Sequence, residues 1–154
     1  MNKKIINTMS IKIPAKSENE SFARAAVAAF CSSLDPTVDE ISDLKTAVSE
    51  AVTNCVVHAY KKRQSNDDII TIDCELYEDM LSVKIADHGV GIADINQAMQ
   101  PFYTTEQDGE RSGMGFTVMQ SFMDDISVNN NLGGGTVVTM KKNFTKEAEK
   151  VSGE

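Results

Sequence analysis

The sequence is poor in cysteine and histidine, which excludes the sites that these residues usually build. Its three cysteines, Cys31, Cys55 and Cys74, are odd in number, far apart and embedded in apolar runs. They predict reduced, buried thiols of a cytoplasmic protein, and neither a disulfide framework nor a zinc site. The two histidines, His58 and His88, are too few and too poorly accompanied to form a zinc site of their own.

Long hydrophobic runs and positive charge are also scarce. No apolar run approaches the ~20 residues that a membrane-spanning helix needs, and Met1–Lys4 is followed by only two apolar residues. With 15 Lys and Arg against 23 Asp and Glu, the net charge of −8 argues against nucleic acid or an anionic membrane as the main partner. We therefore expect a soluble cytoplasmic protein with no direct contact to nucleic acid or membrane.

What the chain does contain is enough apolar material for one domain. It has 154 residues, of which 41% are hydrophobic, so a single core can form. Neither a repeat nor a linker divides it. We expect this domain to span residues 1–144, because the composition of residues 145–154 turns charged and predicts a frayed, disordered tail.

Apolar periodicity and turn residues predict the order of strands and helices. Two capping boxes of the Ser/Thr-x-x-Glu type, at Ser17–Glu20 and Thr37–Glu40, open the first two helices. The complete prediction is strands at 5–13, 69–77, 80–86, 125–130 and 136–142, and helices at 17–30, 37–60, 94–99 and 113–123.

The strand pairs at 69–86 and 125–142 predict antiparallel hairpins, which argues against a fully parallel, doubly wound sheet. We expect an α/β fold of the two-layer α+β type. Its sheet would be mixed and largely antiparallel, with three main helices on one face.

The helix predicted at 37–60 separates a core face from a polar face. At ~100° per residue, one arc of about 100° holds its apolar residues, which are Ile41, Leu44, Val48, Ala51, Val52, Cys55 and Ala59. Glu50 and Asn54 lie roughly opposite and one turn apart, on a face shared with Ala47, Thr53, Val57 and His58. A solvated face is the simple alternative, but Asn is a poor helix-interior residue. A carboxylate and an amide oxygen at this spacing can orient a nucleophile and coordinate a hard cation, respectively.

A second candidate segment, Asp87-His88-Gly89-Val90-Gly91, directly follows the strand predicted at 80–86. Its glycines permit close backbone approach, and the carboxylate at a strand end can accept a hydrogen bond from the exocyclic amine of a purine. An ordinary Asp-Gly turn is the alternative interpretation.

A third segment, Gly113-Met114-Gly115, opens a predicted helix, whose free amides and dipole can receive phosphate oxygens. Arg111 precedes it and can supply a cation to a terminal phosphate. An isolated Gly-x-Gly is weak evidence, and its value lies in its position between a polar loop and an amphipathic helix.

The sequence contains no Gly-x-x-x-x-Gly-Lys-Ser/Thr P-loop, and it lacks the Gly-rich loop, lysine and Asp-Phe-Gly set of eukaryotic-type kinases. A different nucleotide site is indicated by four segments taken together in one small domain. They supply a carboxylate, a metal-binding amide and glycine-flanked loops, and they are Ser49–Asn54, Asp87–Gly91, Arg111–Phe116 and Gly133–Thr136.

These segments resemble, in order, the motif boxes of the GHKL ATPases, the group that includes histidine kinases and type II topoisomerases. Within that group the chain is similar to the anti-sigma factors of sporulating bacteria that act as serine kinases, up to about Lys142. The most specific parts are Ser49–Asn54, Gln100–Thr105 and Glu110–Phe116. The resemblance implies a Bergerat-type ATP-binding fold, ATP and Mg²⁺ as cofactors, a sigma factor as partner, an anti-anti-sigma factor as phosphorylated substrate, and a homodimer.

The resemblance also implies residue roles. Asn54 would hold Mg²⁺, and Glu50 would act as a base or orient the attacking serine. Asp87 would read the adenine with support from Thr136, beside the loop that contains Gly89 and Gly91.

The remaining implied roles concern the phosphates. Gly113, Met114 and Gly115 would bind them together with a lid at 104–112, which begins with Thr104 and Thr105. Arg111 would touch both the phosphate and the partner protein.

Three alternatives share this ATP site. A detached histidine-kinase ATPase domain would be expected to carry a phospho-acceptor helix pair, which is absent before residue 17, and the lid here is short. A catalytically silent anti-sigma module would be expected to have lost Glu50 or Asn54, yet both are present. A topoisomerase fragment would need a following transducer domain, for which 154 residues leave no room.

Overall fold

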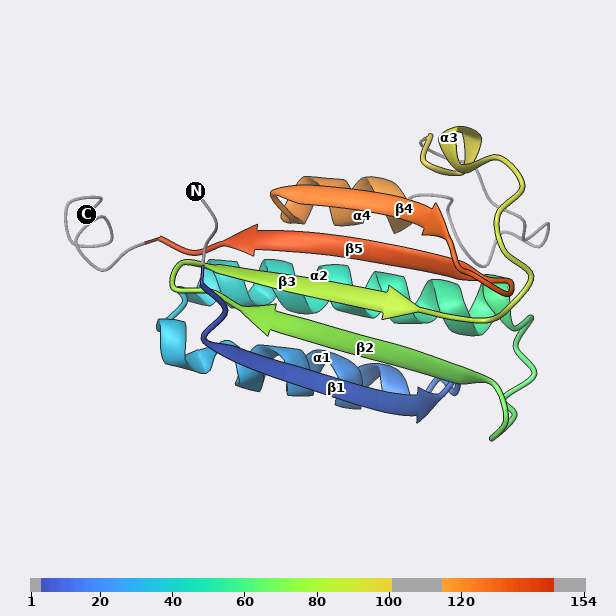
Figure 1. The fold of residues 1–154 in the computed structure, drawn as a ribbon, viewed down its shortest axis with the longest axis horizontal. Coiled ribbons are helices and arrows are strands. Elements are labelled where there is room, and N and C mark those ends of the chain that lie inside the picture. Colours follow the sequence, from blue (N-terminus) through green and yellow to red (C-terminus); the bar gives the residue numbers. More distant parts are fainter. Residues whose placement is uncertain (1–3, 101–114, 146–154) are drawn as a thin grey trace.

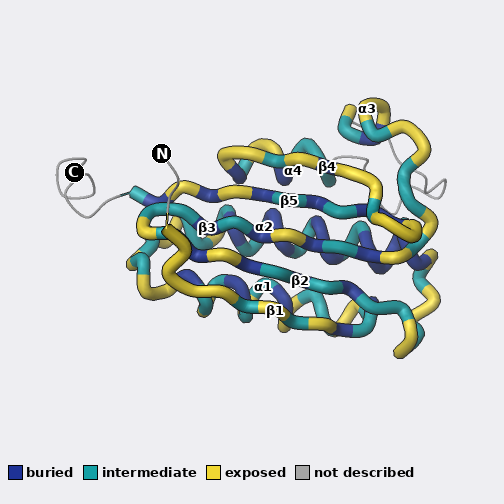
Figure 2. Tube along the Cα trace, viewed as in Figure 1, coloured by how far each residue is buried: buried dark blue, intermediate teal, exposed yellow. Residues whose placement is uncertain are grey.

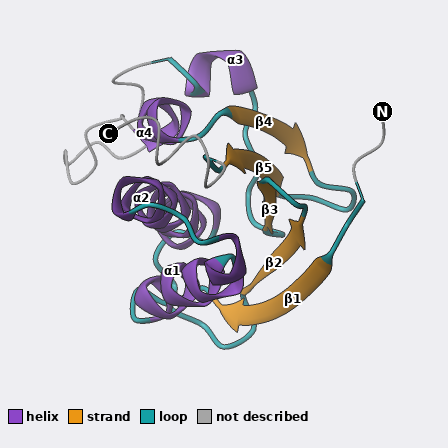
Figure 3. Ribbon diagram, turned by 90° about the vertical axis from the view of Figure 1, so that its left-hand side faces the viewer, coloured by secondary structure: helices purple, strands orange, loops and turns teal. Residues whose placement is uncertain are grey.

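The computed structural model describes residues 4–100 and 115–145, and these form a two-layer sandwich of one sheet and one layer of helices (Figures 1 and 3). The sheet has the order β1-β2-β3-β5-β4, and each of its four pairings is antiparallel. The largely antiparallel character predicted from the two hairpins is therefore confirmed, but the expectation of a mixed sheet is wrong, because no pairing among the described strands is parallel. Its strands are β1 (Asn7–Pro14), β2 (Ile69–Leu76), β3 (Met80–Ala86), β4 (Asp125–Asn130) and β5 (Thr136–Asn143).

The helices cover one face of this sheet, as predicted (Figure 3). The short α3 lies apart, beyond the end of β4 that leads into the β4–β5 turn (Figure 1). The helical elements are α1 (Asn19–Phe30), η1 (Ser32–Leu34), α2 (Val38–Asn54), η2 (Cys55–Ala59), α3 (Ile95–Ala98) and α4 (Gly115–Phe122). Among the described residues, no helix is both long enough and apolar enough to cross a membrane.

Buried residues recur along the strands and along α2 (Figure 2), and they form the core between the two layers. Along β2 and β5 every second residue is buried, so each strand presents one apolar face to the helices. Leu44, Val48 and Val52 of α2 are fully buried against this face. Burial of each such side chain contributes roughly 1.5–3 kcal/mol relative to its exposure.

The helix predicted at 37–60 has a more complicated structure than its sequence suggested. The α-helix ends at Asn54, and Cys55–Ala59 continues it as a π-helix. The placement of Ala47 and Val57 on the polar face was wrong, because both are buried, with 0% and 8% exposure. Both α1 and α4 pack against α2, and these contacts extend the buried part of α2 beyond the predicted arc.

Only one of the two predicted capping boxes forms. At Thr37 the hydroxyl accepts from Glu40 N (3.1 Å) and the Glu40 carboxylate accepts from Thr37 N (2.8 Å), so this box is confirmed. The box predicted at Ser17 is wrong. Helix α1 has Glu18 as its N-cap without a side-chain hydrogen bond, because the Ser17 hydroxyl accepts instead from Gln64 Nε2 (3.0 Å).

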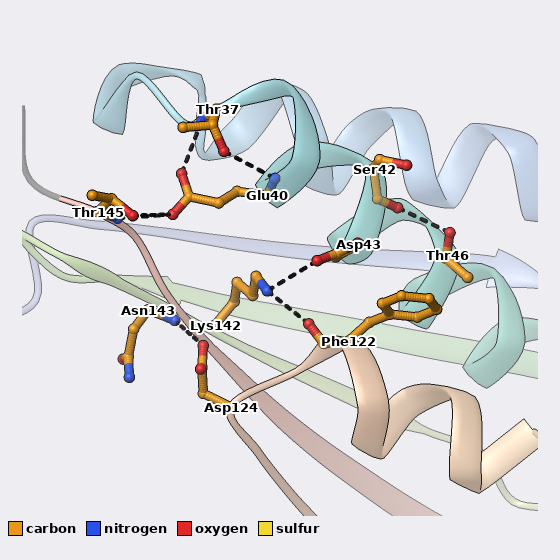
Figure 4. A network of polar contacts seen from close by, with 10 residues as sticks. All are labelled: Thr37, Glu40, Ser42, Asp43, Thr46, Phe122, Asp124, Lys142, Asn143 and Thr145. Carbon is orange, nitrogen blue, oxygen red and sulfur yellow. Dashed lines mark hydrogen bonds and ion pairs between the residues drawn. The ribbon is translucent and has the colours of Figure 1, made fainter. Parts of the chain in front are cut away.

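A polar network ties the helices to the end of β5 (Figure 4). Lys142 is only 9% exposed, and its Nζ donates to the carbonyl of Phe122 at the end of α4 (2.7 Å) and pairs with Asp43 of α2 (3.6 Å). The Glu40 carboxylate also accepts from the amide and hydroxyl of Thr145, at 2.8 and 2.9 Å. The network therefore fixes α2 and α4 on the last strand, up to the end of the described chain. The tail predicted to fray lies, apart from Thr145, outside the described residues.

Candidate functional site

The described parts of the predicted site segments converge at one end of the molecule. There α2 ends, β3 ends and β5 begins (right-hand side of Figure 1). A cavity of about 320 Å³ opens at this end. It is lined by residues from α2 and η2, the segment after β3, α3, and the first residues of α4 and β5. A volume of this size is typical of a small-molecule site.

Asp87 forms a buried polar centre in the cavity wall. It directly follows β3, as predicted, and only 4% of it is exposed. Its Oδ1 accepts from the backbone amides of Gly89 (3.0 Å) and Thr136 (3.1 Å), and its Oδ2 accepts from the Cys55 thiol, with Sγ at 3.6 Å. Burial raises the pKa of the Asp87 carboxyl, and these hydrogen bonds oppose the rise.

The fixed geometry of Asp87 depends on two close backbone approaches. At Gly89 a Cβ would overlap the carbonyl of Ala59, and at Gly135 a Cβ would overlap the carbonyl of Asp87 itself. These glycines let η2 and the β4–β5 turn approach the segment after β3 from two sides. Asn131 of that turn adds a hydrogen bond from Nδ2 to the Asp87 carbonyl (2.8 Å).

Tyr60 is a positioning residue that sequence reasoning missed. Its hydroxyl accepts from His88 N and donates to the carbonyl of Ile69, both at 2.7 Å. Val90 N donates to the carbonyl of Ala59 (3.0 Å). The end of η2 thus holds the segment after β3 in place. A π-helix often marks a functional site, but its single extra residue per turn leaves no signal in apolar periodicity.

Asn54 and Glu50 occupy neighbouring positions on α2, and both are half-buried. Asn54 is the last residue of the α-helix and lines the cavity. Glu50, one turn earlier, borders a separate, shallower hollow that also involves Arg24 of α1 and Lys45 of α2. The carboxylate and the amide therefore lie on one side of the helix, but only the amide reaches the cavity.

The structure brings part of the predicted residue set together. Five members line the cavity, and they are Asn54, Asp87, Gly91, Gly115 and Thr136. Gly89 does not line it but donates its amide to Asp87. Glu50 borders the separate hollow instead. The remaining predicted members lie outside the described residues, and they are Thr104, Thr105, Arg111, Gly113 and Met114.

The apolar part of the lining was not predicted as such. Ile92, Ala98, Phe116 and Val138 contribute hydrophobic surface around Asp87. Their sequence positions, in a loop, a four-residue helix and two element ends, carry no shared pattern that would have grouped them.

These residues fit a purine base. A buried carboxylate beside apolar side chains can accept from an exocyclic amine, because Oδ2 keeps acceptor capacity beyond its thiol contact. They also fit a metal ion held mainly by phosphates. No cluster of three His, Cys, Asp or Glu side chains occurs among residues 4–100 and 115–145, and Mg²⁺ commonly takes only one or two protein oxygens beside phosphate and water. Asn54 could supply such an oxygen.

This fold and this cavity define a class of nucleotide-binding domain, and comparison with known proteins identifies it. Residues 13–142 match the model of the histidine kinase-like ATPase domain. The chain is 56% identical over 138 residues to an anti-sigma F factor of Clostridium beijerinckii, covering 90% of this chain and 95% of that one. It is 54% identical over 139 residues to an anti-sigma F factor of Clostridium acetobutylicum, covering 90% and 94%.

Solved structures agree at the level of the fold. A Mycobacterium tuberculosis protein with RsbU and RsbW domains superposes with a TM-score of 0.64 at 17% identity, over 90% of this chain and 32% of that one. The catalytic domain of the histidine kinase ThkA gives 0.56 at 14% identity, over 91% and 97%. The chain therefore belongs to the histidine kinase-like ATPase family and, within it, to the anti-sigma F factor group. The resemblance to the GHKL ATPases seen in the sequence motifs is confirmed.

Proposed function

We propose that this protein is an anti-sigma factor that binds a sporulation sigma factor and, with ATP, phosphorylates a serine of the anti-anti-sigma antagonist. The observation that carries the proposal is the identity of 56% to a relative named anti-sigma F factor, across 95% of that relative. The chain contains both polar residues of α2, Glu50 and Asn54, on which a catalytic role depends.

Nucleotide recognition would begin at Asp87. Its carboxylate accepts a hydrogen bond from the adenine amine, while Thr136 and Gly89 hold the carboxylate through their amides. Gly91, which lines the cavity at φ +75°, lets the segment after β3 turn alongside the base. The apolar lining packs against the faces of the base and excludes water from this hydrogen bond.

The phosphates would extend towards the start of α4. Gly115 is the first residue of α4, where the positive end of the helix dipole favours anionic oxygens, and by the resemblance Gly113 and Met114 would bind the phosphates with it. In the lid, Thr104 and Thr105 would add hydroxyl donors, and Arg111 would neutralise charge on the terminal phosphate and contact the partner protein.

Asn54 would hold Mg²⁺ through its amide oxygen. When bound, the ion neutralises phosphate charge that develops during transfer. Glu50 lies one turn before Asn54, and its carboxylate would orient the serine hydroxyl of the substrate and accept its proton. The substrate serine would approach from the side of α2 on which Glu50 borders its shallow hollow.

The oligomeric state and the cellular location of the protein are proposed from the same resemblance. We propose that the protein works as a homodimer in the cytoplasm, as the resemblance to anti-sigma factor kinases implies. Its net charge of −8 is consistent with protein partners and with the absence of direct nucleic-acid binding.

The decisive experiment removes the proton acceptor. Glu50→Gln keeps the size and polarity of the side chain but cannot take up the serine proton. Transfer of labelled γ-phosphate to the anti-anti-sigma protein of the same organism should fall by roughly 10²–10⁴, the usual share of a positioned general base. Binding of ATP and of the sigma factor should persist, because neither requires that proton transfer.

The control is Glu18→Gln, a carboxamide substitution beside α1 at a residue that does not border either hollow. It should leave transfer unchanged. Wild-type transfer by Glu50→Gln would contradict the role of Glu50. A wild-type protein that binds ATP and the sigma factor but never labels the antagonist would be a catalytically silent anti-sigma module.

A further inference from the structure

The thiol of Cys55 lies at the centre of the base-recognition end of the cavity. Cys55 is the first residue of η2, is 4% exposed, and lines the cavity beside Asn54. From the sequence it was assigned only to the apolar arc of the helix. In the structure its Sγ lies 3.6 Å from Oδ2 of Asp87, and the thiol donates to that oxygen.

The two carboxylate oxygens of Asp87 accept from different kinds of donor. Oδ1 is occupied by two backbone amides, from Gly89 and Thr136. Oδ2 has only the thiol as donor among the described residues. Among the described residues, Cys55 is therefore the only one whose side chain donates to Oδ2. A thiol is a weaker donor than a backbone amide.

We propose that Cys55 is a positioning and specificity residue for the nucleobase, whose thiol holds the Asp87 carboxylate so that Oδ2 faces the exocyclic amine of adenine. This inference rests on the proposed nucleotide site and assigns the discrimination of the base to a pair, Cys55 with Asp87.

The chemistry of the thiol suits this task better than that of its closest replacements. A thiol is a weak donor and otherwise a small apolar group, so it can be buried without a second partner and leaves Oδ2 able to accept from the ligand. A serine hydroxyl would form a shorter, charge-assisted hydrogen bond with Oδ2 and compete with the adenine amine. Alanine would remove the donor and leave the carboxylate held at Oδ1 alone.

The test compares two triphosphates that differ only in the group that Asp87 would read. Equilibrium dissociation constants are measured for ATP and for the triphosphate of purine riboside, which lacks the exocyclic amine. In the wild-type protein ATP should bind more tightly. Cys55→Ala should weaken ATP binding roughly 2- to 10-fold, the range for one hydrogen bond, and leave binding of the analogue unchanged. Cys55→Ser should also weaken ATP binding selectively.

A double-substitution cycle separates positioning from packing. In the Asp87→Asn background, Cys55→Ala should have no further effect on ATP binding, because the carboxylate through which the thiol acts is gone. The matched control is Cys74→Ala, which truncates another buried thiol, 1% exposed and outside the cavity. It should alter neither dissociation constant.

Several outcomes would overturn the inference. Equal weakening of both triphosphates, or weakening that persists in the Asp87→Asn background, would make Cys55 a filler of space. Unchanged ATP binding in both Cys55 variants would leave the thiol without a role in recognition. A wild-type protein that binds neither triphosphate would refute the nucleotide site itself, whereas a preference for ATP that is the same in Cys55→Ala as in the wild type would refute only the part assigned to the thiol.

Discussion

Replacing Asp87 by asparagine tests the base-recognition end of the cavity with the smallest possible change. The substitution exchanges one carboxylate oxygen for an amide NH₂ group and keeps the volume of the side chain. In the structure Oδ1 accepts from two backbone amides, and the carbonyl oxygen of asparagine can accept from the same two. The local backbone should therefore be preserved, and the change should fall on Oδ2, the oxygen proposed to face adenine.

The expected loss of ATP affinity follows from the group that the new amide would face in the complex. An NH₂ group opposite the adenine amine places two donors against each other in a buried site, since Asp87 is only 4% exposed. An unsatisfied buried polar group costs about 1–3 kcal/mol. This corresponds to a loss of ATP affinity of roughly 5- to 150-fold. Isothermal titration calorimetry of ATP binding can measure a change of that size.

The folding stability of Asp87→Asn should not fall with its ATP affinity. Burial raises the pKa of Asp87 in the folded state above its unfolded value, so the ionised carboxylate lowers folding stability as the pH rises through the folded-state pKa. Asp87→Asn removes this cost, and the ligand-free variant should melt at or above the wild-type temperature at neutral pH. ATP binding by the wild type should weaken as the pH falls through the same pKa, because the protonated carboxyl loses an acceptor.

The control is Asp67→Asn at an exposed position between η2 and β2, which should change neither affinity nor stability. Unchanged ATP affinity in Asp87→Asn would remove Asp87 from the site. Lost affinity together with a lower melting temperature would show that the carboxylate is mainly structural, and the reasoning from its two oxygens would be refuted.

Two further predictions concern α2. Asn54→Ala should abolish the increase in ATP affinity that Mg²⁺ provides while the melting temperature stays close to that of the wild type. ATP titrations with Mg²⁺ and with EDTA test this, and a Mg²⁺ effect that survives would exclude Asn54 as the ligand. Glu40→Ala should lower the free energy of unfolding by about 1–3 kcal/mol, because its carboxylate accepts from Thr37 and Thr145. Burial raises the pKa of Glu40, but these hydrogen bonds outweigh it and the net pKa is lowered, so the contribution should be lost as the pH falls through that pKa. Urea unfolding of both proteins at several pH values would reveal this, and a difference independent of pH would contradict it.

Most of the fold could be predicted because its signals are local. The strand at 125–130 was predicted with the bounds that the structure gives, and the Thr37 capping box forms as its spacing indicates. The Ser17 box failed because a residue 47 positions away, Gln64, binds the same hydroxyl. A sequence pattern reports which donors are near in the chain, and it does not report a distant competitor that the fold brings closer.

In the candidate site, too, the residues with local sequence signals could be predicted and those that act through distant contacts could not. Asp87, Asn54 and Thr136 could be proposed from motifs, since Asp87 and Thr136 stand at the ends of predicted strands and Asn54 is an asparagine in the interior of a predicted helix. Tyr60 and Cys55 could not, because their roles arise from contacts with His88 and Asp87, residues about 30 positions away. Both sit in or directly after the π-helix, where the change of helical period alters which side chains face the cavity.

The π-helix also explains how a rigid core and a nucleotide pocket can share one helix. Through Asn54 the helix keeps the α-period, which the buried stripe of Leu44, Val48 and Val52 requires. From Cys55 onward the turn is wider. There the Cys55 thiol donates to Asp87 and the Ala59 carbonyl accepts from Val90 N. The Tyr60 hydroxyl accepts from His88 N. A regular α-helix through this region would rotate these groups relative to one another. We infer that the change of period at the cavity lets the core arrangement of α2 and the polar arrangement around Asp87 coexist in neighbouring turns.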